Sequence, residues 1–269
     1  MISDALAQPR PLVHEVLGEA YVGAERFELP WGCSAVVVPS PDVTLEHDRQ
    51  QAVYAGLVPV SSAAFGADMT EYWRDRSVND YFGRLAEFVL VADRDGALVG
   101  WTGYSLLDSG AGTNVYIDSS GVVPSGQSQG VMRAVMAHRL KAGILASLAS
   151  RDRVYVSARS ESPVFYKLMR GLVGAENLFP HPELRTPPDV LECGRHLAGW
   201  LGQAELMESG SLVVRNAYAV LDELYGELPS SADPALDRMF RNTLGPLDAY
   251  LLVGRVARPE KERLGCEGR

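Results

Sequence analysis

The sequence predicts a mixed α/β fold built on one sheet, and three observations support this. A turn containing Asp95-Gly96 separates the apolar runs 88–92 and 98–104, which is typical of a β-hairpin. A third run, 113–123, predicts a further strand, which passes through a turn of small residues into an amphipathic stretch. A strand at 154–156 follows that stretch, so the helix between them indicates a right-handed crossover between parallel strands.

The remaining elements follow from breakers and from apolar spacings of three and four. A β-branched run at 34–38 lies between Trp31-Gly32 and Pro39 and predicts a strand, and the run 250–256 predicts the last one. We expect helices or helical segments opening at 45–48, near 69–88, at 131–148, from 163 to about 172, and near 189–208, 216–227 and 235–244.

The composition is that of an ordinary globular protein. The 269 residues are 46% hydrophobic and 22% charged, enough for one elaborated domain or a domain with a smaller subdomain. No apolar run approaches the roughly 18 residues that a membrane span needs. The first residues, Met1 to Asp4, have neither the basic nor the apolar part of a secretory signal, so we expect a cytoplasmic protein.

Charge and cysteine content exclude several classes of function. A net charge of −9 without a dense basic patch argues against a nucleic-acid partner. The three cysteines, Cys33, Cys193 and Cys266, are far apart and odd in number, which indicates reduced thiols. Cys193 and His196 have the spacing of metal ligands, but no second pair lies nearby to complete a zinc site, so we expect no metal.

The segment 121–132 carries the most chemistry. A strand, a Gly/Gln-rich turn and a helix start bring free N–H groups and the positive end of a helix dipole together, which favours a phosphate or pyrophosphate site. The P-loop template G-x-x-x-x-G-K-S/T fits residues 121–128 except at Gln127. Glutamine cannot supply the charge that the template lysine gives to the phosphates, so we reject a P-loop.

The same segment resembles the acyl-CoA loop of the GNAT (GCN5-related N-acetyltransferase) superfamily. That signature is V-x-P-x-x-Q/R-x-x-G-x-G/A, and Val122, Pro124, Gln127 and Gly130 stand at the matching positions. Met132 departs from the small residue at the end. The order of elements over 34–172 also matches. The resemblance implies a mixed, mostly antiparallel central sheet flanked by helices, with a helical C-terminal insertion before the last strand.

The resemblance also implies how the chain is divided. We expect an N-terminal extension (1–33), an acyl-CoA-binding core (34–174), a mainly helical insertion on the substrate side (175–247), a final strand (248–258) and a flexible tail (259–269).

For the cofactor, the resemblance implies acetyl-CoA or another acyl-CoA as cosubstrate, with its pantetheine arm inserted between the fourth and fifth strands. Gly121 is then a candidate β-bulge, although an ordinary strand-end glycine explains it equally well. Arg159 stands where the family has an asparagine. The implied cofactor-binding residues are Gly121, Val122, Val123, Gln127, Ser128, Gln129, Gly130, Val131, Met132 and Arg159.

Three residues are candidates for catalysis. Tyr166 stands at the family's tyrosine position, where it would donate a proton to the departing thiolate; packing beside Phe165 is the alternative. Asp118 and Tyr116 share one face of the predicted strand 113–123. They would serve as general base and water-positioning partner, and the alternative is a pair of polar residues on a half-exposed strand.

The resemblance therefore implies an N-acetyltransferase that passes an acetyl group from acetyl-CoA directly to an amine of a small molecule, with no nucleic acid or membrane as partner. It leaves a homodimer open. Met132, Arg159 and the pair Arg170-Gly171, where the family has Gly-Phe, favour an alternative, a non-catalytic acyl-CoA-binding sensor or partner module. Neither the acceptor nor the acyl chain length can be read from the residues.

Overall fold

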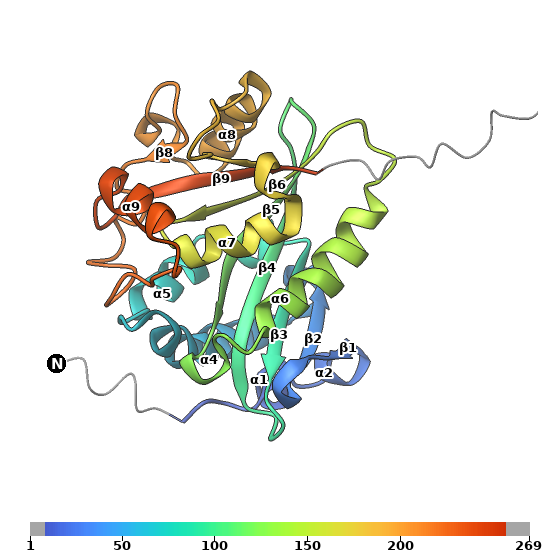
Figure 1. Ribbon diagram of the computed structural model, residues 1–269. Coiled ribbons are helices and arrows are strands. Elements are labelled where there is room, and N and C mark those ends of the chain that lie inside the picture. Colours follow the sequence, from blue (N-terminus) through green and yellow to red (C-terminus); the bar gives the residue numbers. More distant parts are fainter. Residues whose placement is uncertain (1–8, 257–269) are drawn as a thin grey trace, which may run out of the picture.

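A single twisted sheet organises the chain in the computed structural model, which describes residues 9–256 (Figure 1). Its order is β1-β2-β3-β4-β5-β6-β9-β7, and β8 pairs with β9 beside this path. Every described strand pair is antiparallel except β5 with β6. The strands are β1 Glu25–Glu28, β2 Ser34–Pro39, β3 Glu87–Ala92, β4 Leu98–Asp108, β5 Thr113–Val122, β6 Val154–Ser160, β7 Leu178–Phe179, β8 Val213–Val214 and β9 Ala249–Arg255.

Helices pack on this sheet. Figure 1 shows α6 and α7 crossing in front of the strands, and α4 packs against β4 and β5. The helix that begins with α6 continues without a break as a π-helix, Met136–Leu145. The helices are α1 Val13–Leu17, α2 Ala20–Gly23, α3 Pro41–Thr44, α4 His47–Phe65, α5 Thr70–Val78, α6 Val131–Val135, α7 Pro163–Val173, α8 Pro188–Trp200 and α9 Pro234–Thr243. No helix within residues 9–256 is long and apolar enough to cross a membrane.

The predicted fold class is confirmed: the sheet is mixed and mostly antiparallel, and helices flank it. The hairpin predicted around Asp95-Gly96 joins β3 to β4, and the crossover from 113–123 to 154–156 joins the parallel strands β5 and β6. These predictions hold because each rests on a local signal, either a turn residue or the period of the apolar positions.

Two helix predictions are wrong in whole or in part. The segment 216–227 forms turns, not a helix. Its backbone bonds elsewhere: the N–H of Tyr218 donates to Leu247 O and that of Gly226 to Phe65 O. The helix expected near 69–88 ends at Val78, because Asp80 has a left-handed φ of 50°. The predicted tail 259–269, with Cys266, lies outside the described residues.

An irregularity in β5 opens the sheet. β5 pairs with β6 from Thr113 to Ile117 and no further. The register against β4 then shifts, since Gly103 faces Asp118 but Thr102 faces Ser120, which leaves Ser119 as an extra residue. Ser119 has a left-handed φ of 60°. The second half of β5 therefore leaves β6, and the two strands diverge in Figure 1.

Trp101 supports the bulge from β4. Its indole Nε1 donates to Ser119 Oγ at 2.8 Å, and its ring is completely buried. The ring also lies against Gly121, where an added Cβ would come within 2.4 Å of the ring atom Cη2. Gly121 is therefore not the bulge that the sequence offered as one alternative: the extra residue is Ser119, and Gly121 pairs regularly with Trp101. A glycine is required at 121 because the indole ring packs directly on its backbone.

Replacing Gly121 by alanine tests this packing. We expect Gly121→Ala to lower the free energy of unfolding by about 1–3 kcal/mol, because the new methyl group overpacks the site beside Trp101. Gly171→Ala in α7 is the matched control: nothing lies within 4 Å of its Cβ position, so the change is expected to be neutral or to stabilise by up to about 1 kcal/mol. Urea unfolding of both variants measures the difference. Equal stabilities would contradict the assignment.

Candidate functional site

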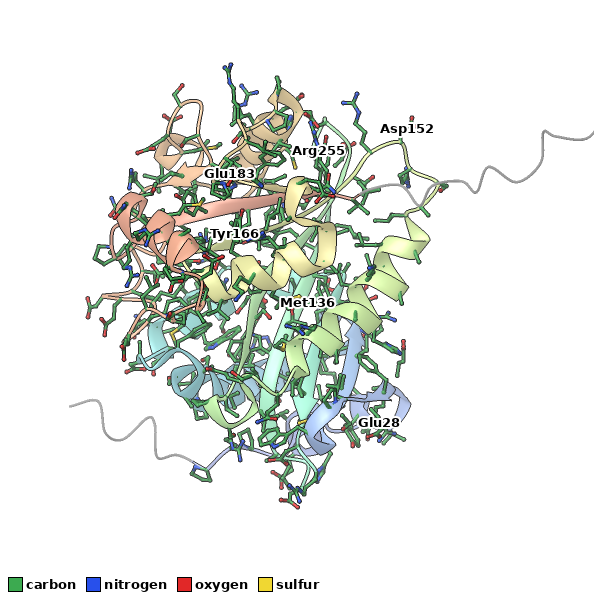
Figure 2. All side chains as sticks on the ribbon, in the orientation of Figure 1. Glu28, Met136, Asp152, Tyr166, Glu183 and Arg255 are labelled. Carbon is green, nitrogen blue, oxygen red and sulfur yellow. The ribbon has the colours of Figure 1, made fainter. Side chains whose placement is uncertain are left out.

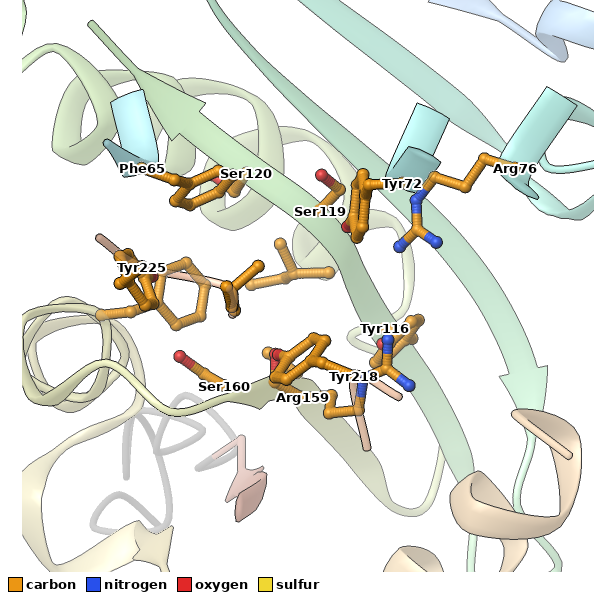
Figure 3. Close-up of a pocket in the computed structure, with 14 residues that line it drawn as sticks. Phe65, Tyr72, Arg76, Tyr116, Ser119, Ser120, Arg159, Ser160, Tyr218 and Tyr225 are labelled. Carbon is orange, nitrogen blue, oxygen red and sulfur yellow. The ribbon is translucent and has the colours of Figure 1, made fainter. Parts of the chain in front are cut away.

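Two adjoining cavities lie where β5 and β6 diverge. The larger, about 900 Å³, lies between the 121–133 segment, α7 and residues 227–232. The smaller, about 50 Å³, lies toward α5 (Figure 3). Phe65, Ser120, Phe165 and Tyr225 line both. The two cavities therefore share a wall made by these four residues.

The loop predicted to bind an anion forms one wall of the larger cavity. Residues 124–126 make a 3₁₀ turn, and Gly130, with a left-handed φ of 79°, directly precedes α6. The first bond of the helix runs from Ala134 N to Gly130 O. The N–H groups of Val131, Met132 and Arg133 thus have no acceptor within the helix and are available to a ligand.

Positive side chains accompany these N–H groups. Arg133, in the first turn of α6, and Lys167, in α7, both line the larger cavity. Lys167 Nζ donates to Ser231 O at 2.7 Å, which fixes the ammonium group against the opposite wall. Two cations and a helix N-terminus make this cavity a favourable place for phosphate groups, although the whole chain has a net charge of −9.

Gln127 has a structural use in this loop. Its amide nitrogen donates to Val122 O at 3.1 Å and to Ala64 O at 3.2 Å, so the side chain joins the loop to the end of α4. Met132, the departure from the family pattern, lines the cavity while partly buried against the core. The remaining predicted cofactor residues that line the larger cavity are Gly121, Val122, Ser128, Gly130 and Val131.

Three predicted cofactor residues lie elsewhere. Val123 is buried in the core, and Gln129 is exposed at the loop; neither lines a cavity. Arg159 lines the smaller cavity. Its guanidinium lies over the ring of Tyr218 at 4.6 Å, and no residue of the 122–132 loop lines that cavity.

Tyr166, labelled in Figure 2, belongs to α7 and lines neither cavity. Its hydroxyl donates to Pro180 O at 2.9 Å, and its buried ring contacts Phe240 edge-on. Burial raises the pKa of Tyr166 to about 12. The neighbouring side chain, Phe165, lines both cavities instead. The catalytic role of Tyr166 stays a prediction, and its observed contacts are structural.

Asp118 is held by an ion pair. Its Oδ1 accepts from Arg76 at 3.0 Å, its carbonyl accepts from Tyr81 at 2.8 Å, and its side chain lines neither cavity. Its proposed partner Tyr116 does line the smaller cavity. The role of Asp118 as general base also stays a prediction; in the structure it positions Arg76.

Sequence reasoning missed most of the smaller cavity. Arg76 comes from α5, and its guanidinium lies 4.0 Å from the ring centroid of Tyr72. Tyr218 and Tyr225 come from the turns at 216–227, where no pattern marks them as site residues. Figure 3 shows these aromatic and cationic side chains converging from elements far apart in the sequence.

Glu161 is a second residue that the sequence did not reveal. It follows β6 directly, buried, between Ser160 of the smaller cavity and Ser162 of the larger. Burial, together with the negative charge of Asp248, raises the pKa of Glu161 to about 8. This carboxyl group is therefore mostly protonated at neutral pH.

Other candidates have no support as ligands. Among residues 9–256, no three His, Cys, Asp or Glu side chains are arranged to hold a metal ion. Cys193 is buried on α8, and burial raises the pKa of its thiol to about 12.

The raised pKa of Glu161 predicts a pH-dependent stability. The folded chain binds this proton more tightly than the unfolded chain, so the stabilising contribution is complete below about pH 4.5 and is lost as the pH rises through about 8. We expect Glu161→Gln to flatten the fall in melting temperature between pH 5 and 8. Glu205→Gln, at an exposed position, should leave the profile unchanged. Identical profiles for wild type and Glu161→Gln would contradict the burial argument.

One family model matches part of the chain. Residues 52–155 match the model of the acetyltransferase (GNAT) family. No protein in the curated set matches the sequence.

Solved structures resemble the chain at low identity. The Escherichia coli ribosomal-protein-S18-alanine N-acetyltransferase is 12% identical, with a TM-score of 0.42 over 85% of this chain and 97% of that one. The NatC complex bound to Gag peptide and CoA is 11% identical, with a TM-score of 0.41 over 83% of this chain and 99% of that one. A GNAT family N-acetyltransferase from Escherichia coli in complex with CoA is 13% identical, with a TM-score of 0.35 over 53% of this chain and 69% of that one.

Proposed function

We propose that the chain transfers an acetyl group from acetyl-CoA to an amine of a small molecule, because residues 52–155 match the model of the acetyltransferase (GNAT) family. The observation that carries this proposal is the wall of the larger cavity. There the free N–H groups at the start of α6 lie beside Arg133, in a cavity that adjoins a second, smaller one.

The cavities suit the two halves of the reaction. The pyrophosphate of CoA would lie against residues 128–133, where N–H groups and Arg133 neutralise it. The pantetheine arm would follow β5 beyond Ile117, since that edge no longer pairs with β6 and can bond an extended ligand. The thioester then reaches the junction of the cavities, beside Tyr225.

At the junction the amine attacks the thioester carbon. The new C–N bond forms, the C–S bond breaks, and the proton that leaves the amine finally neutralises the CoA thiolate. Tyr225 lies at this junction, and burial raises the pKa of its phenol, which keeps it protonated as a hydrogen-bond donor. We assign the contact with the departing sulfur to Tyr225, with Tyr166 as the alternative that the sequence favours.

The size of the smaller cavity supports a small acceptor. It offers about 50 Å³ of open space, and one water molecule needs about 10–15 Å³ by the same measure. Only a head group of a few non-hydrogen atoms fits there without movement of the tyrosines. A non-catalytic acyl-CoA sensor remains the second candidate, because the hydroxyl of Tyr166 is engaged with Pro180 and not with the cleft.

Loss of Arg133 tests the CoA site. We expect Arg133→Gln to raise the Kd for CoA about tenfold or more, since a charged hydrogen bond contributes about 1.5–3 kcal/mol. Lys141→Gln is the control, because it removes the same charge from an exposed position on the same helix. Calorimetric titration with CoA compares the two. If CoA does not bind the wild-type protein at millimolar concentration, the proposed function fails.

A pair of Tyr→Phe variants tests the assignment of the proton donor. We expect Tyr225→Phe to lower the rate of acetyl transfer at least tenfold with a CoA Kd near that of wild type. Tyr166→Phe should keep the rate and lose about 1 kcal/mol of stability, because Pro180 O loses its donor. Acetyl-CoA turnover on a panel of amines, with urea unfolding beside it, measures both. The reverse result assigns the donor to Tyr166, and CoA binding without turnover favours the sensor.

A further inference from the structure

Two arginines line the smaller cavity from opposite sides. Arg76 comes from α5 and Arg159 from β6, and Figure 3 shows both guanidinium groups at this cavity. Each lies near a tyrosine ring: Arg76 is 4.0 Å from the centroid of Tyr72, and Arg159 is 4.6 Å from that of Tyr218. Aromatic faces stabilise a cation, but they do not neutralise it.

Within residues 9–256, carboxylates pair with only one of these two arginines. Asp118 pairs with Arg76 at 3.0 Å. Arg159 donates to the neutral amide of Gln203 at 2.8 Å, and within residues 9–256 no carboxylate lies in ion-pair range of it. Glu161 is close enough for its charge, like that of Arg159, to influence the pKa of Tyr218. It is mostly protonated at neutral pH, however, because burial raises its pKa. One positive charge therefore stays unbalanced at the cavity.

Hydrogen-bonding capacity is unused as well. The Nε atoms of Arg76 and Arg159 are both buried and have no hydrogen-bond partner. Buried polar atoms are nearly always paired in folded proteins, so the chain itself satisfies neither of these guanidinium groups completely. The two positive charges also repel each other, which an anion between them would relieve.

The chemistry of a group that would satisfy them follows from shape and charge. A guanidinium binds a planar carboxylate through two parallel hydrogen bonds. The open space of about 50 Å³ suits a carboxylate with a few neighbouring atoms. The phosphates of CoA, in contrast, have their own positive wall in the larger cavity, at Arg133 and Lys167.

We propose that the smaller cavity binds a carboxylate of the substrate, held by Arg159 and Arg76. This inference rests on the proposed acetyl-CoA-type transferase function and adds the substrate class to it. Two molecules can bring this carboxylate to the junction of the cavities. One is the acceptor, which would then be an amino acid or a similar amine with a carboxylate. The other is the acyl group of a dicarboxylic acyl-CoA, such as succinyl-CoA.

Binding measurements in two arms distinguish these sources. The first compares L-amino acids with their neutral amides, L-alanine against L-alaninamide for example, on the full-length protein with and without CoA. The second compares succinyl-CoA with butyryl-CoA, which has the same chain length and no carboxylate. We expect a carboxylate preference of at least tenfold in Kd in one arm. The arm that shows it identifies the source.

Variants then test whether Arg159 causes the carboxylate preference. Arg159→Gln should reduce the preference to within about twofold of unity, whereas Arg159→Lys, which keeps the charge, should restore part of it. Arg195→Gln removes one positive charge from an exposed position on α8 and serves as the control; it should keep the wild-type preference. The Kd for CoA, which contacts the other cavity, should stay within about twofold of wild type in all three variants.

The outcomes separate this inference from the proposed function. If CoA does not bind the wild-type protein, the proposed function fails, and the first arm on the CoA-free protein still reports whether a carboxylate binds. If CoA binds but wild type shows no carboxylate preference in either arm, the inference is overturned while the proposed function stands. A preference that Arg159→Gln leaves intact also overturns it. The wild-type comparison decides the question even where a variant fails to fold.

Discussion

One extra residue in β5 makes the site possible. A regular strand would pair with β6 along its whole length and close the sheet, but the bulge at Ser119 ends that pairing after Ile117. A left-handed φ at a residue other than glycine costs about 1–3 kcal/mol and persists only where its surroundings enforce it. Trp101 bonds Ser119 from β4, and Tyr81 bonds the carbonyl of Asp118. The aromatic core thus holds the strand in its opened form.

The opened sheet also separates two kinds of positive charge. In the larger cavity, backbone N–H groups and exposed cationic side chains face open space, where a highly charged, solvated ligand such as a pyrophosphate enters at little cost. In the smaller cavity, Arg76 and Arg159 lie among tyrosine rings with little access to water. There an ion pair is stronger, and a mismatched ligand is penalised more strongly. The first cavity suits affinity for a common cofactor, and the second suits selection of the substrate.

The sequence predicted what depends on local signals and missed what depends on the bulge. Strand and helix periods, turn residues and the 122–130 loop are readable within a short window, and the structure has them. The argument for Asp118 assumed that side chains alternate regularly along β5. The bulge breaks this alternation where Asp118 lies, so Ile117, Ser119 and Ser120 line the smaller cavity and Asp118 does not.

Helix α7 and the turns at 216–227 show two further limits. Successive side chains on a helix differ in direction by about 100°. Phe165 therefore lines the cavities, whereas Tyr166, the residue selected by its position in the family motif, bonds Pro180 instead. Tyr218 and Tyr225 have the spacing of a helical face, but their backbone bonds to distant partners, and no local window contains that information. Long-range contacts thus determine which aromatic residues reach the reacting groups.

The two features that the sequence could not predict, the bulge and the arginine pair, are physically connected. Asp118 is the residue at which the register of β5 shifts, and its carboxylate holds Arg76 in the smaller cavity. The distortion that opens the sheet therefore also places a cation in the smaller cavity. Asp118 is engaged by Arg76 and does not pair with Arg159, so in our proposal the balancing charge comes from a bound molecule. A substrate carboxylate in the smaller cavity would thus also stabilise the opened sheet, because it would neutralise Arg159.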